Sequence, residues 1–508
     1  MSELVRKILI VGGGTAGWMT AAQLSKTFGE HVQISVIESE RIGTIGVGEA
    51  TFNTIKVFFD SLGLEERDWM PHCAATYKLA IRFVNWNAEG RTFYHPFERY
   101  KTMDGFALPE WWLKLRPAER PLDYACFSTP HLCDLRRAPR YLDGTIFDAD
   151  TAHPYAYHFD AQRLASFLRD FAIRRGVLRI EQDVIEVTLD DRGAVGAIRT
   201  HDGVSHRADL FVDCTGFQGL LINQALREPF VSFGDSLLCD RAVATRLPRA
   251  RPGHDINPFT TATALGGGWV WDIPLFNGTG TGYVYSSRFL SEGEAETEFR
   301  MHLGPPGSDI DVKHIKMRIG RTRNPWVKNC VAIGLSAGFV EPLESTGIFF
   351  IQYGIAELLA NFPRSGLNEH IALNYNRAVG ACIDGVRDFL ILHYYLSTRS
   401  DTPFWRAVKE DIEIPGAVRE RVALWQHRFP TSSSINPAYH GFAPYSYTVM
   451  LTGLGHTPLE SHPGVHARDE ARARALFEAL AQRSALLGAE LPSHGAYLRS
   501  LFRLEDPG

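Results

Sequence analysis

The sequence predicts an α/β protein with a Rossmann-type core, a second sheet and a mainly helical C-terminal module. A strand–helix–strand pattern opens the chain, strand-like segments that end in glycine recur downstream, and helical periodicity dominates after about residue 360. We therefore expect a first module over residues 1–360, with inserted elements at about 94–147 and 230–320, and a helical module over residues 361–508.

The first 38 residues carry the opening strand–helix–strand pattern. The apolar run Lys7–Val11 is typical of a buried parallel strand, and a helix is expected to begin near Gly17. Val32–Ile37 has the composition of a second strand, which ends at Glu38. Together these segments predict one βαβ unit.

A G-x-G-x-x-G pattern lies between the first strand and the helix. Gly12 permits the tight turn, Gly14 lets a pyrophosphate approach the backbone, and Gly17 lets helix and strand pack closely. The helix N-terminus would hold the pyrophosphate, and Glu38 has the spacing of an acid that binds a ribose hydroxyl. The alternative is a glycine turn without a ligand. The expected dinucleotide contacts here are Gly12, Gly14, Thr15, Ala16, Gly17 and Glu38.

Two later strand ends favour FAD over NAD as the dinucleotide. Asp213–Gly216 follows one apolar strand, and Cys330–Gly334 ends another. Large flavoproteins with a glutathione-reductase-like core return to the cofactor at several strand ends, which makes this an argument from architecture. We therefore expect Gly334 and Leu335 to contact FAD.

Composition argues against several other classes of function. The chain has 508 residues, of which 45% are hydrophobic and 22% charged, and its formal net charge of −5 without a basic run argues against nucleic acid as a partner. No apolar stretch reaches about 18 residues and no signal-peptide pattern is evident, so we expect no membrane span and a cytoplasmic location. Seven scattered cysteines and 19 histidines show no metal-site spacing, so no metal is expected.

Five segments of the chain resemble a known enzyme family. They are Ile45–Thr51, Gly268–Pro274, Phe339–Ile348, His393–Leu396 and Asp401–Trp405. The second of these contains the pattern W-x-W-x-I-P. In this combination the chain resembles the flavin-dependent halogenases, specifically the tryptophan halogenase family, from residue 8 to about residue 455.

The resemblance implies a two-component bacterial oxidoreductase. It would use FADH2, O2 and a halide ion, bromide or chloride, to transfer electrophilic halogen from hypohalous acid to a small indole-like aromatic. A separate NAD(P)H-dependent flavin reductase would supply the FADH2, because no second nucleotide fingerprint is evident in the sequence. A homodimer is possible as the assembly.

Lys78 matches the essential lysine of the family. In the family, hypohalous acid travels through a tunnel to this lysine, which holds it by a hydrogen bond or as a haloamine. The pattern alone favours a different interpretation. Alternation within Tyr77–Phe83 places Lys78, Ala80 and Arg82 on one face of a strand, where a lysine is ordinarily solvated.

Glu344 matches the catalytic carboxylate of the family, which would polarise the halogen species or take the proton of the arenium intermediate. The alternative is an acid that caps the following helix. Family members bind halide at backbone amides that match Thr346 and Gly347, and Ser345 would lie at the substrate site.

The remaining site residues are assigned by the same resemblance. Trp269 and Trp271, on one side of an extended segment, would wall off a space beside the flavin, with sheet core as the alternative. His95 and Phe97 would stack on the indole, with a packed loop as the alternative for His95. The flavin-contacting loop is matched by Gly48, Glu49, Ala50 and Thr51.

One segment departs from the family. Tryptophan halogenases hold the ammonium and carboxylate of the amino acid with a pattern that includes paired tyrosines and a glutamate, and Phe429–Gly441 contains no paired tyrosine, glutamate or tryptophan. We therefore predict indole, a substituted indole or a larger indole-bearing molecule as substrate in place of free tryptophan. A more open site should also handle bromide better than chloride. The rival interpretations are an FAD-dependent aromatic monooxygenase without halide use and a non-catalytic FAD-binding protein.

Overall fold

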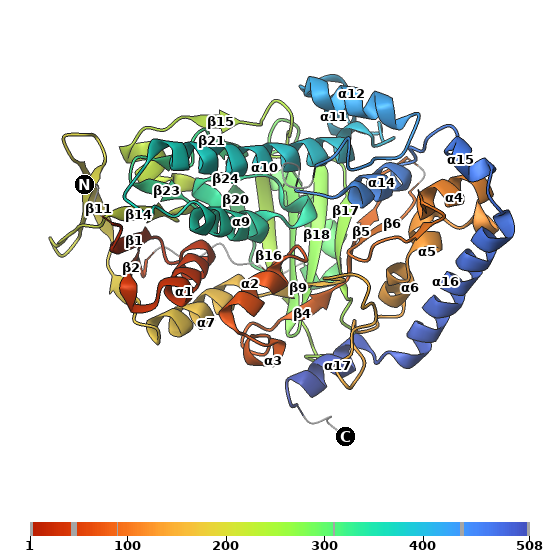
Figure 1. Cartoon of the computed structure of the whole chain (residues 1–508), viewed down its shortest axis with the longest axis horizontal. Helices are drawn as coiled ribbons and strands as arrows, with labels where there is room; N and C mark the ends of the chain where they lie inside the picture. Colours follow the sequence, from red (N-terminus) through yellow and green to blue (C-terminus); the bar gives the residue numbers. More distant parts are fainter. Residues whose placement is uncertain (1–3, 42–47, 89, 308–309, 437–440, 505–508) are drawn as a thin grey trace. The chain divides into compact units, whose positions relative to one another are not determined.

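The computed structural model describes residues 4–41, 48–88, 90–307, 310–436 and 441–504 (Figure 1). The chain forms two compact units, and each unit takes three segments of the sequence. Unit 1 comprises Met1–Cys73, Phe159–Gly234 and Met317–Gly385, and unit 2 comprises Ala74–His158, Asp235–Lys316 and Val386–Gly508. The boundary expected near residue 360 lies inside the last segment of unit 1, so it coincides with no limit of either unit.

Unit 1 is built around a sheet with the strand order β10-β2-β1-β14-β23-β22. Its first four strand pairs are parallel, and β22 joins the edge antiparallel. The strands are β1 (Lys7–Val11), β2 (Gln33–Glu38), β10 (Leu178–Glu181), β14 (Leu210–Asp213), β22 (Trp326–Val327) and β23 (Cys330–Ala332). Buried aliphatic side chains of β1 and β14 form the centre of this core, as expected for strands covered on both faces. The predicted βαβ unit and both later strands are therefore confirmed.

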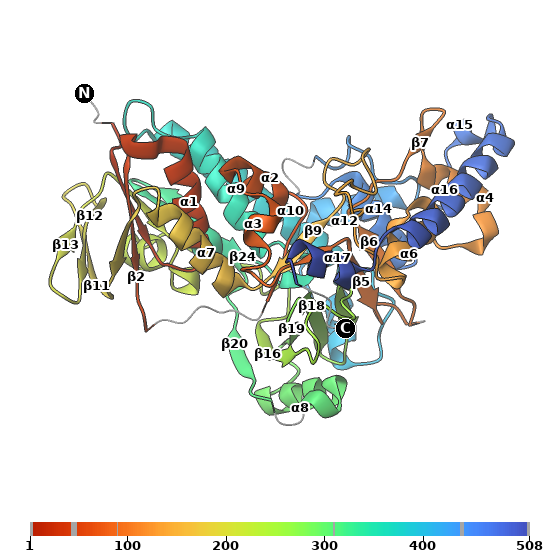
Figure 2. The same cartoon turned by 90° about the horizontal axis from the view of Figure 1, so that it is seen from below.

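Helices α1 (Thr15–Phe28) and α7 (Ala161–Ile173) of unit 1 lie side by side (Figures 1 and 2). Asp160 caps α7 by accepting hydrogen bonds from the backbone amides of Gln162 and Arg163. Strands β11 (Val184–Leu189) and β12 (Val195–Thr200) form an antiparallel hairpin. The other elements of unit 1 are β3 (Glu49–Ala50), α2 (Ile55–Leu62), α3 (Glu66–Trp69), β11 (Val184–Leu189), β12 (Val195–Thr200), β13 (Ser205–His206), β15 (Phe230–Ser232), β21 (Gly320–Thr322), β24 (Gly338–Phe339) and α9 (Gly347–Ala360).

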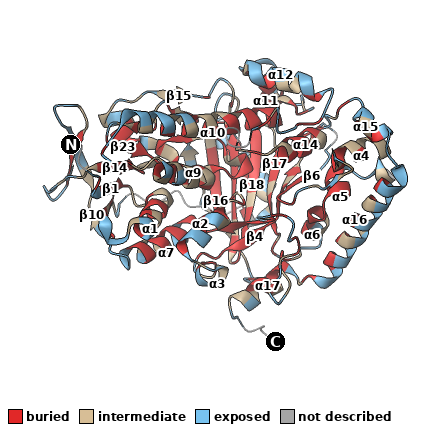
Figure 3. Cartoon of the chain, in the orientation of Figure 1, coloured by how far each residue is buried: buried red, intermediate tan, exposed pale blue. Residues whose placement is uncertain are grey.

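Unit 2 contains the second predicted sheet, with the strand order β20-β16-β19-β18-β17-β5-β6. All its pairs are antiparallel except β17 with β5. Its central strands are strongly buried (Figure 3). The strands are β5 (Ala80–Val84), β6 (Phe93–Pro96), β16 (Arg241–Pro248), β17 (Phe259–Ala264), β18 (Gly268–Leu275), β19 (Gly278–Tyr285) and β20 (Lys313–Lys316).

Two short strands, β4 (Thr76–Lys78) and β9 (Ala156–Phe159), pair antiparallel beside this sheet. The C-terminal part of unit 2 is helical, as predicted, and includes α16 (Glu470–Glu490). Long helix α10 (Glu369–Tyr395) begins in unit 1 and ends in unit 2. The other elements of unit 2 are β7 (Thr102–Met103), β8 (Phe106–Ala107), α4 (Leu108–Leu115), α5 (Leu122–Cys126), α6 (Thr129–Asp134), α8 (Glu292–Leu303), α11 (Pro403–Glu410), α12 (Gly416–Trp425), α14 (Pro444–Gly453), α15 (Pro463–His466) and α17 (His494–Leu501).

Among the residues that the structure describes, no helix combines the length and the apolar character needed to cross a lipid bilayer.

Candidate active site

The glycine-rich turn of unit 1 follows β1 and leads into α1. Gly12 has φ = 109°, and a Cβ there would overlap the carbonyl oxygen of Cys214 at the end of β14. A Cβ at Gly17 would overlap the carbonyl oxygen of Gly12, so this close approach of helix and turn requires glycine. Gly14 is the N-cap residue of α1 and offers no side chain to the first amides of the helix, which Thr15 and Ala16 begin.

Gly334, the downstream glycine predicted to contact the cofactor, lies against the first turn of α1. Gly334 follows β23 with φ = 78°, and a Cβ there would lie 2.8 Å from the Cβ of Ala16. Leu335 follows it in a 3-10 turn and is partly buried. The carboxyl ends of β1, β14 and β23 and the N-terminus of α1 therefore meet in unit 1, which is the arrangement that holds a dinucleotide pyrophosphate.

Glu38, the expected ribose ligand, ends β2 and has two partners that the sequence did not indicate. Its Oε2 accepts a hydrogen bond from Trp18 Nε1 at 3.0 Å, and its Oε1 is ion-paired with Arg179 of β10. A Cβ at Gly13 would overlap the Glu38 carboxylate, so the second glycine of the run is also needed. The three consecutive glycines could have indicated that a side chain packs closely against the turn. The ion pair between Arg179 and Glu38 depends instead on the order of the strands in the sheet.

The residues present fit a bound dinucleotide. At the glycine turn, neighbouring atoms leave no room for side chains, and the N-terminus of α1 lacks a side-chain cap. The Glu38 carboxylate at the end of β2 is held in place by a hydrogen bond. In the predicted flavin-contacting loop, Ile45–Thr51, Gly48 has φ = 98°, Ala50 and Thr51 are buried, and burial raises the pKa of Glu49 to about 7. Residues 45–47 of this segment lie outside the described residues.

Glu344 lies in a 3-10 turn, Pro342–Glu344, immediately before α9. Ser345 then adopts φ = 60°, and Thr346, two residues after Glu344, occupies the N-cap position of α9. The Glu344 side chain is buried. The Oγ1 atom of Thr346 is buried and has no hydrogen-bond partner among the described residues, and the helix begins at Gly347. The first amides of such a helix have no partner within the helix, which suits an anion.

Lys78 is fully buried in unit 2, so the solvated strand face that alternation predicts is wrong. The physical reason is a change of sheet. Lys78 ends β4, Leu79 belongs to neither strand, and β5 begins at Ala80 in the larger sheet. Alternation therefore does not continue from Lys78 to Arg82.

The buried ammonium of Lys78 lies against the predicted substrate segment. Lys78 Nζ is 5.2 Å from the centroid of the Phe97 ring, within the range of a cation–π contact. The Phe97 amide donates a hydrogen bond to the carbonyl oxygen of Leu79 at 3.0 Å. Lys78 and Phe97, predicted from separate motifs, are thus brought together.

His95 is 2% exposed and lies among aromatic rings from the C-terminal part of unit 2. The His95 ring centroid is 6.2 Å from Phe389, 6.3 Å from Phe442 and 6.1 Å from Tyr445. These three side chains were not predicted, since only the fold brings residues near 390 and 445 to β6. The arrangement offers flat apolar faces of the kind that bind an aromatic substrate.

Two buried carboxylates hold the ends of the segment that carries His95 and Phe97. Asp123 accepts a hydrogen bond from the Tyr94 amide at 2.9 Å. Glu98 Oε2 accepts hydrogen bonds at 2.8 Å from the Ser128 amide and from both the amide and the hydroxyl of Thr129, at the start of α6. Burial raises the pKa of Asp123 to about 6 and that of Glu98 to about 7.

Trp269 and Trp271 lie in β18 on one face, as the period of 2 predicts, with ring centroids 6.2 Å apart. Both are buried at 1% and 6% exposure. A Cβ at Gly282 of the neighbouring β19 would overlap the Trp271 ring, so glycine leaves room for the indole. The Nε1 atom of Trp271 is buried without a hydrogen-bond partner among the described residues.

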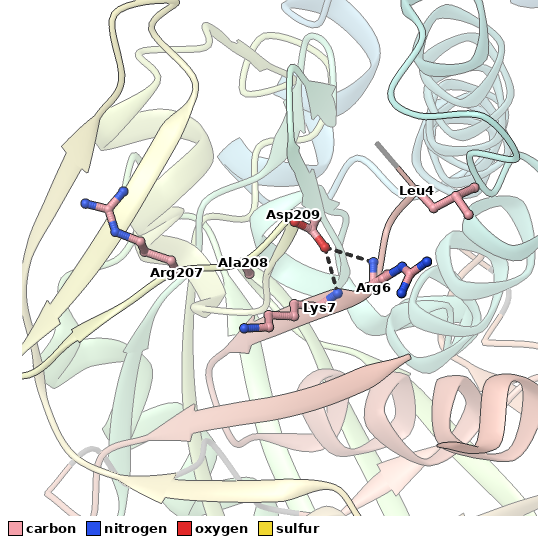
Figure 4. A pocket seen from close by; sticks show the side chains of 6 residues that line it. All are labelled: Leu4, Arg6, Lys7, Arg207, Ala208 and Asp209. Atoms are coloured by element: carbon pink, nitrogen blue, oxygen red, sulfur yellow. Dashed lines mark hydrogen bonds between the residues drawn. The ribbon is translucent and has the colours of Figure 1, made fainter. Parts of the chain in front are cut away.

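A surface hollow of about 600 Å³ lies in unit 1 at the amino ends of β1 and β14, away from the glycine turn (Figure 4). Asp209 accepts hydrogen bonds there from the amides of Arg6 and Lys7 at 2.8 Å each. The side chains of Arg6 and Arg207 point in different directions, so the positive charges do not converge on one ligand position (Figure 4). The hollow is lined by Leu4, Arg6, Lys7, Arg207, Ala208 and Asp209.

Comparison with known proteins identifies the family, because residues 7–470 match the model of the tryptophan halogenases. The chain belongs to the tryptophan halogenase family. It is 46% identical to tryptophan 6-halogenase SttH of Streptomyces toxytricini, over 97% of this chain and 98% of that protein. It is 47% identical to 7-chloro-L-tryptophan 6-halogenase KtzR of Kutzneria sp. (strain 744), over 98% and 100%. The solved structure of Tar14, a tryptophan C-6 flavin-dependent halogenase from taromycin biosynthesis, has a TM-score of 0.93 at 47% identity, covering 98% and 100%.

The match to the tryptophan halogenase family confirms the predicted enzyme class. This tryptophan halogenase family member is a flavin-dependent enzyme that uses FADH2, halide and O2 to halogenate an indole-like aromatic. Its fold is the predicted α/β type, with an FAD-binding Rossmann-type core and a helical C-terminal region. The two rival interpretations, a monooxygenase without halide and a non-catalytic flavoprotein, are not favoured.

Proposed function

We propose that this flavin-dependent halogenase halogenates the indole ring of tryptophan at C6. Three proteins that match almost the whole chain at 46–47% identity carry names that specify halogenation at C6, two of them of tryptophan and one of 7-chloro-L-tryptophan. The proposal departs from the expectation that free tryptophan is not the substrate. That expectation depends on a segment of which residues 437–440 lie outside the described structure, and it carries less weight than agreement over nearly the full length.

Unit 1 would hold the flavin. Gly12 to Gly17 would receive the pyrophosphate, Glu38 a ribose, and Gly334 and Leu335 a further part of FAD. Bound FADH2 supplies two electrons, so that O2, halide and a proton give hypohalous acid, water and FAD. A separate NAD(P)H-dependent flavin reductase would regenerate FADH2. The buried N-terminus of α9 at Thr346 and Gly347 would bind the halide.

Lys78 would deliver the halogen. Its ammonium is fully buried and faces the Phe97 ring, and this single observation supports the role most strongly. The lysine would hold hypohalous acid by a hydrogen bond, or carry the halogen as a haloamine. In either form it transfers the halogen without its bonding electrons to a ring carbon. From hypohalous acid, the oxygen keeps the electron pair and takes a proton from the lysine ammonium, so that water leaves. From a protonated haloamine, the nitrogen keeps the electron pair and the lysine amine is released.

Glu344 would take the proton in the last step. The bond from the halogenated ring carbon to hydrogen breaks, its electron pair restores the aromatic ring, and the proton passes to the carboxylate. A buried carboxylate also stabilises the positive charge of the arenium intermediate. His95 and Phe97 would contact the indole face, and Trp269 and Trp271 would wall off a space beside the flavin.

Replacement of the lysine tests the proposed chemistry. Lys78→Ala should abolish halogenation, measured by isotope pattern in mass spectrometry with reductase, FAD and both halides supplied. FAD binding and oxidation of reduced flavin should persist, because the flavin residues belong to unit 1. Lys316→Ala, at an exposed lysine of β20, is the matched control. Halogenation by the Lys78→Ala variant would refute the role of the lysine.

Competition between substrates tests the acceptor. Equimolar tryptophan and indole should give mainly halogenated tryptophan, with halogen at C6 by NMR. A larger kcat/KM for indole would instead restore the expectation of an open indole site.

A further inference from the structure

The short strand that carries Lys78 is held by a histidine from the last helix of the chain. The Tyr77 amide, in the middle of β4, donates a hydrogen bond to His494 Nε2 at 3.1 Å. His494 Nδ1 lies 3.2 Å from the carbonyl oxygen of Ile256. His494 is fully buried at the start of α17, more than 400 residues away in sequence from the residue it contacts.

The partners of His494 fix its protonation state. A ring nitrogen that accepts a backbone N–H must carry a lone pair, so Nε2 is unprotonated and Nδ1 donates to Ile256. Burial, with a contribution from Arg249, lowers the pKa of His494 to about 4. The ring therefore binds β4 as a neutral acceptor and adds no positive charge beside the Lys78 ammonium.

A second buried histidine contacts Thr76, two residues before the lysine in β4. Thr76 Oγ1 donates to the Pro274 carbonyl oxygen at 2.6 Å, so its lone pair can accept from His158 Nδ1 at 3.0 Å. His158 Nε2 then accepts from Thr260 Oγ1 at 2.9 Å. Burial and the charge of Lys78 hold the pKa of His158 well below its usual value.

The register places His158 beside the lysine. His158 of β9 is opposite Thr76, and Lys78 is two residues along from Thr76, so all three side chains project from one face of this strand pair. The bond from Thr76 reaches β18, the strand of Trp269 and Trp271. The two residues that precede the lysine are therefore attached to β9, β18 and α17.

We propose that His494 and His158 are positioning residues for Lys78. As neutral rings they fix the backbone and the orientation of β4, so that the ammonium receives hypohalous acid and presents halogen to the substrate before the acid escapes into solution. The inference depends on the proposed role of Lys78. If β4 is loosened, halide should still be oxidised, but less of the halogen should reach the substrate. The reason is that displacement of a reacting group by about 1 Å can cost on the order of 100-fold in rate.

Two variants of His494 separate ring shape from hydrogen bonding. His494→Phe keeps an aromatic ring and removes the acceptor of the Tyr77 amide, whereas His494→Gln retains an acceptor oxygen near the position of Nε2. We expect His494→Phe to lower halogenated tryptophan formed per FADH2 consumed about tenfold or more. The rate of oxidation of reduced flavin and the KM for tryptophan should stay within about twofold of the wild-type values. We call the amount of halogenated tryptophan formed per FADH2 consumed the coupling, and His494→Gln should retain most of it.

Release of hypohalous acid provides the readout that a merely structural role would not change. An enol scavenger in solution should be halogenated faster by His494→Phe than by wild type, with FAD binding unchanged. His302→Gln, at an exposed histidine of α8, is the matched control. Unchanged coupling in a folded His494→Phe variant would overturn the proposal.

If His494→Phe does not fold, variants of Thr76 test the same positioning role. Thr76→Val keeps the shape of the side chain and removes the hydroxyl that contacts Pro274 and His158, whereas Thr76→Ser keeps the hydroxyl. Loss of coupling in Thr76→Val with recovery in Thr76→Ser supports the proposal, and full coupling in both overturns it. Halogenation by Lys78→Ala would refute the lysine role itself, which is a separate outcome.

Discussion

Glu98 gives the structure a pH dependence of stability whose sign and size can be stated. The carboxylate is buried beside the predicted substrate segment and accepts three hydrogen bonds at 2.8 Å. Burial is the largest influence on its pKa, with Asp148 raising it and Arg483 and the Thr129 hydrogen bonds lowering it, and the result is a rise from 4.5 to about 7. The folded state therefore favours the protonated acid more than the unfolded state does.

The consequence follows from linkage between protonation and folding. Because the folded-state pKa is raised, the stability contributed by Glu98 is fully present below about pH 4.5 and is lost as the pH rises through about 7. The difference between these two pKa values corresponds to about 3 kcal/mol of the free energy of unfolding. Glu98→Gln resembles the protonated acid at every pH, since its amide oxygen can still accept from the Ser128 and Thr129 amides.

We expect wild type and Glu98→Gln to be equally stable near pH 4.5 and to diverge above it. At pH 8 the variant should be more stable by up to about 3 kcal/mol, or about 3 °C in Tm if the chain unfolds as a whole. The measurement is thermal unfolding followed by tryptophan fluorescence at several pH values. Glu478→Gln, at an exposed position of α16, is the control. Parallel curves for wild type and Glu98→Gln would refute the argument.

Three further outcomes are expected. Gly17→Ala should abolish FAD binding in a fluorescence titration, because its Cβ would overlap the Gly12 carbonyl oxygen, whereas Gly293→Ala, in open space on α8, should leave binding unchanged. Asp123→Ala should raise the KM for the aromatic substrate about tenfold, because it leaves the Tyr94 amide without its acceptor. Asp123→Asn should return the KM most of the way to the wild-type value. The same KM in wild type and both variants would contradict this role of Asp123. In direct competition, bromide should be incorporated in preference to chloride because bromide is the easier ion to oxidise, and a chloride-dominated product mixture would contradict that expectation.

Local sequence patterns determined the FAD-binding part of unit 1. The positions of β1, α1, β2 and β14 follow from apolar runs and glycines that act within a few residues of one another, and so does the need for Gly17, whose Cβ would overlap the Gly12 carbonyl oxygen. The overlap that requires Gly12 comes from Cys214 and depends on the pairing of β1 with β14. Strand type and turn chemistry are short-range properties. The motif resemblance then extended this prediction to the enzyme class, which the family match confirmed.

The tertiary structure alone decided the surroundings of Lys78. Alternation predicts a solvated lysine on one continuous strand, but the chain changes sheet at Leu79 and the ammonium becomes fully buried. His494 and Phe442 reach β4 and β6 from the far end of the sequence, and Arg179 reaches Glu38 through strand order. Burial and long-range contact depend on how segments pack together, so no pattern confined to one segment can specify them.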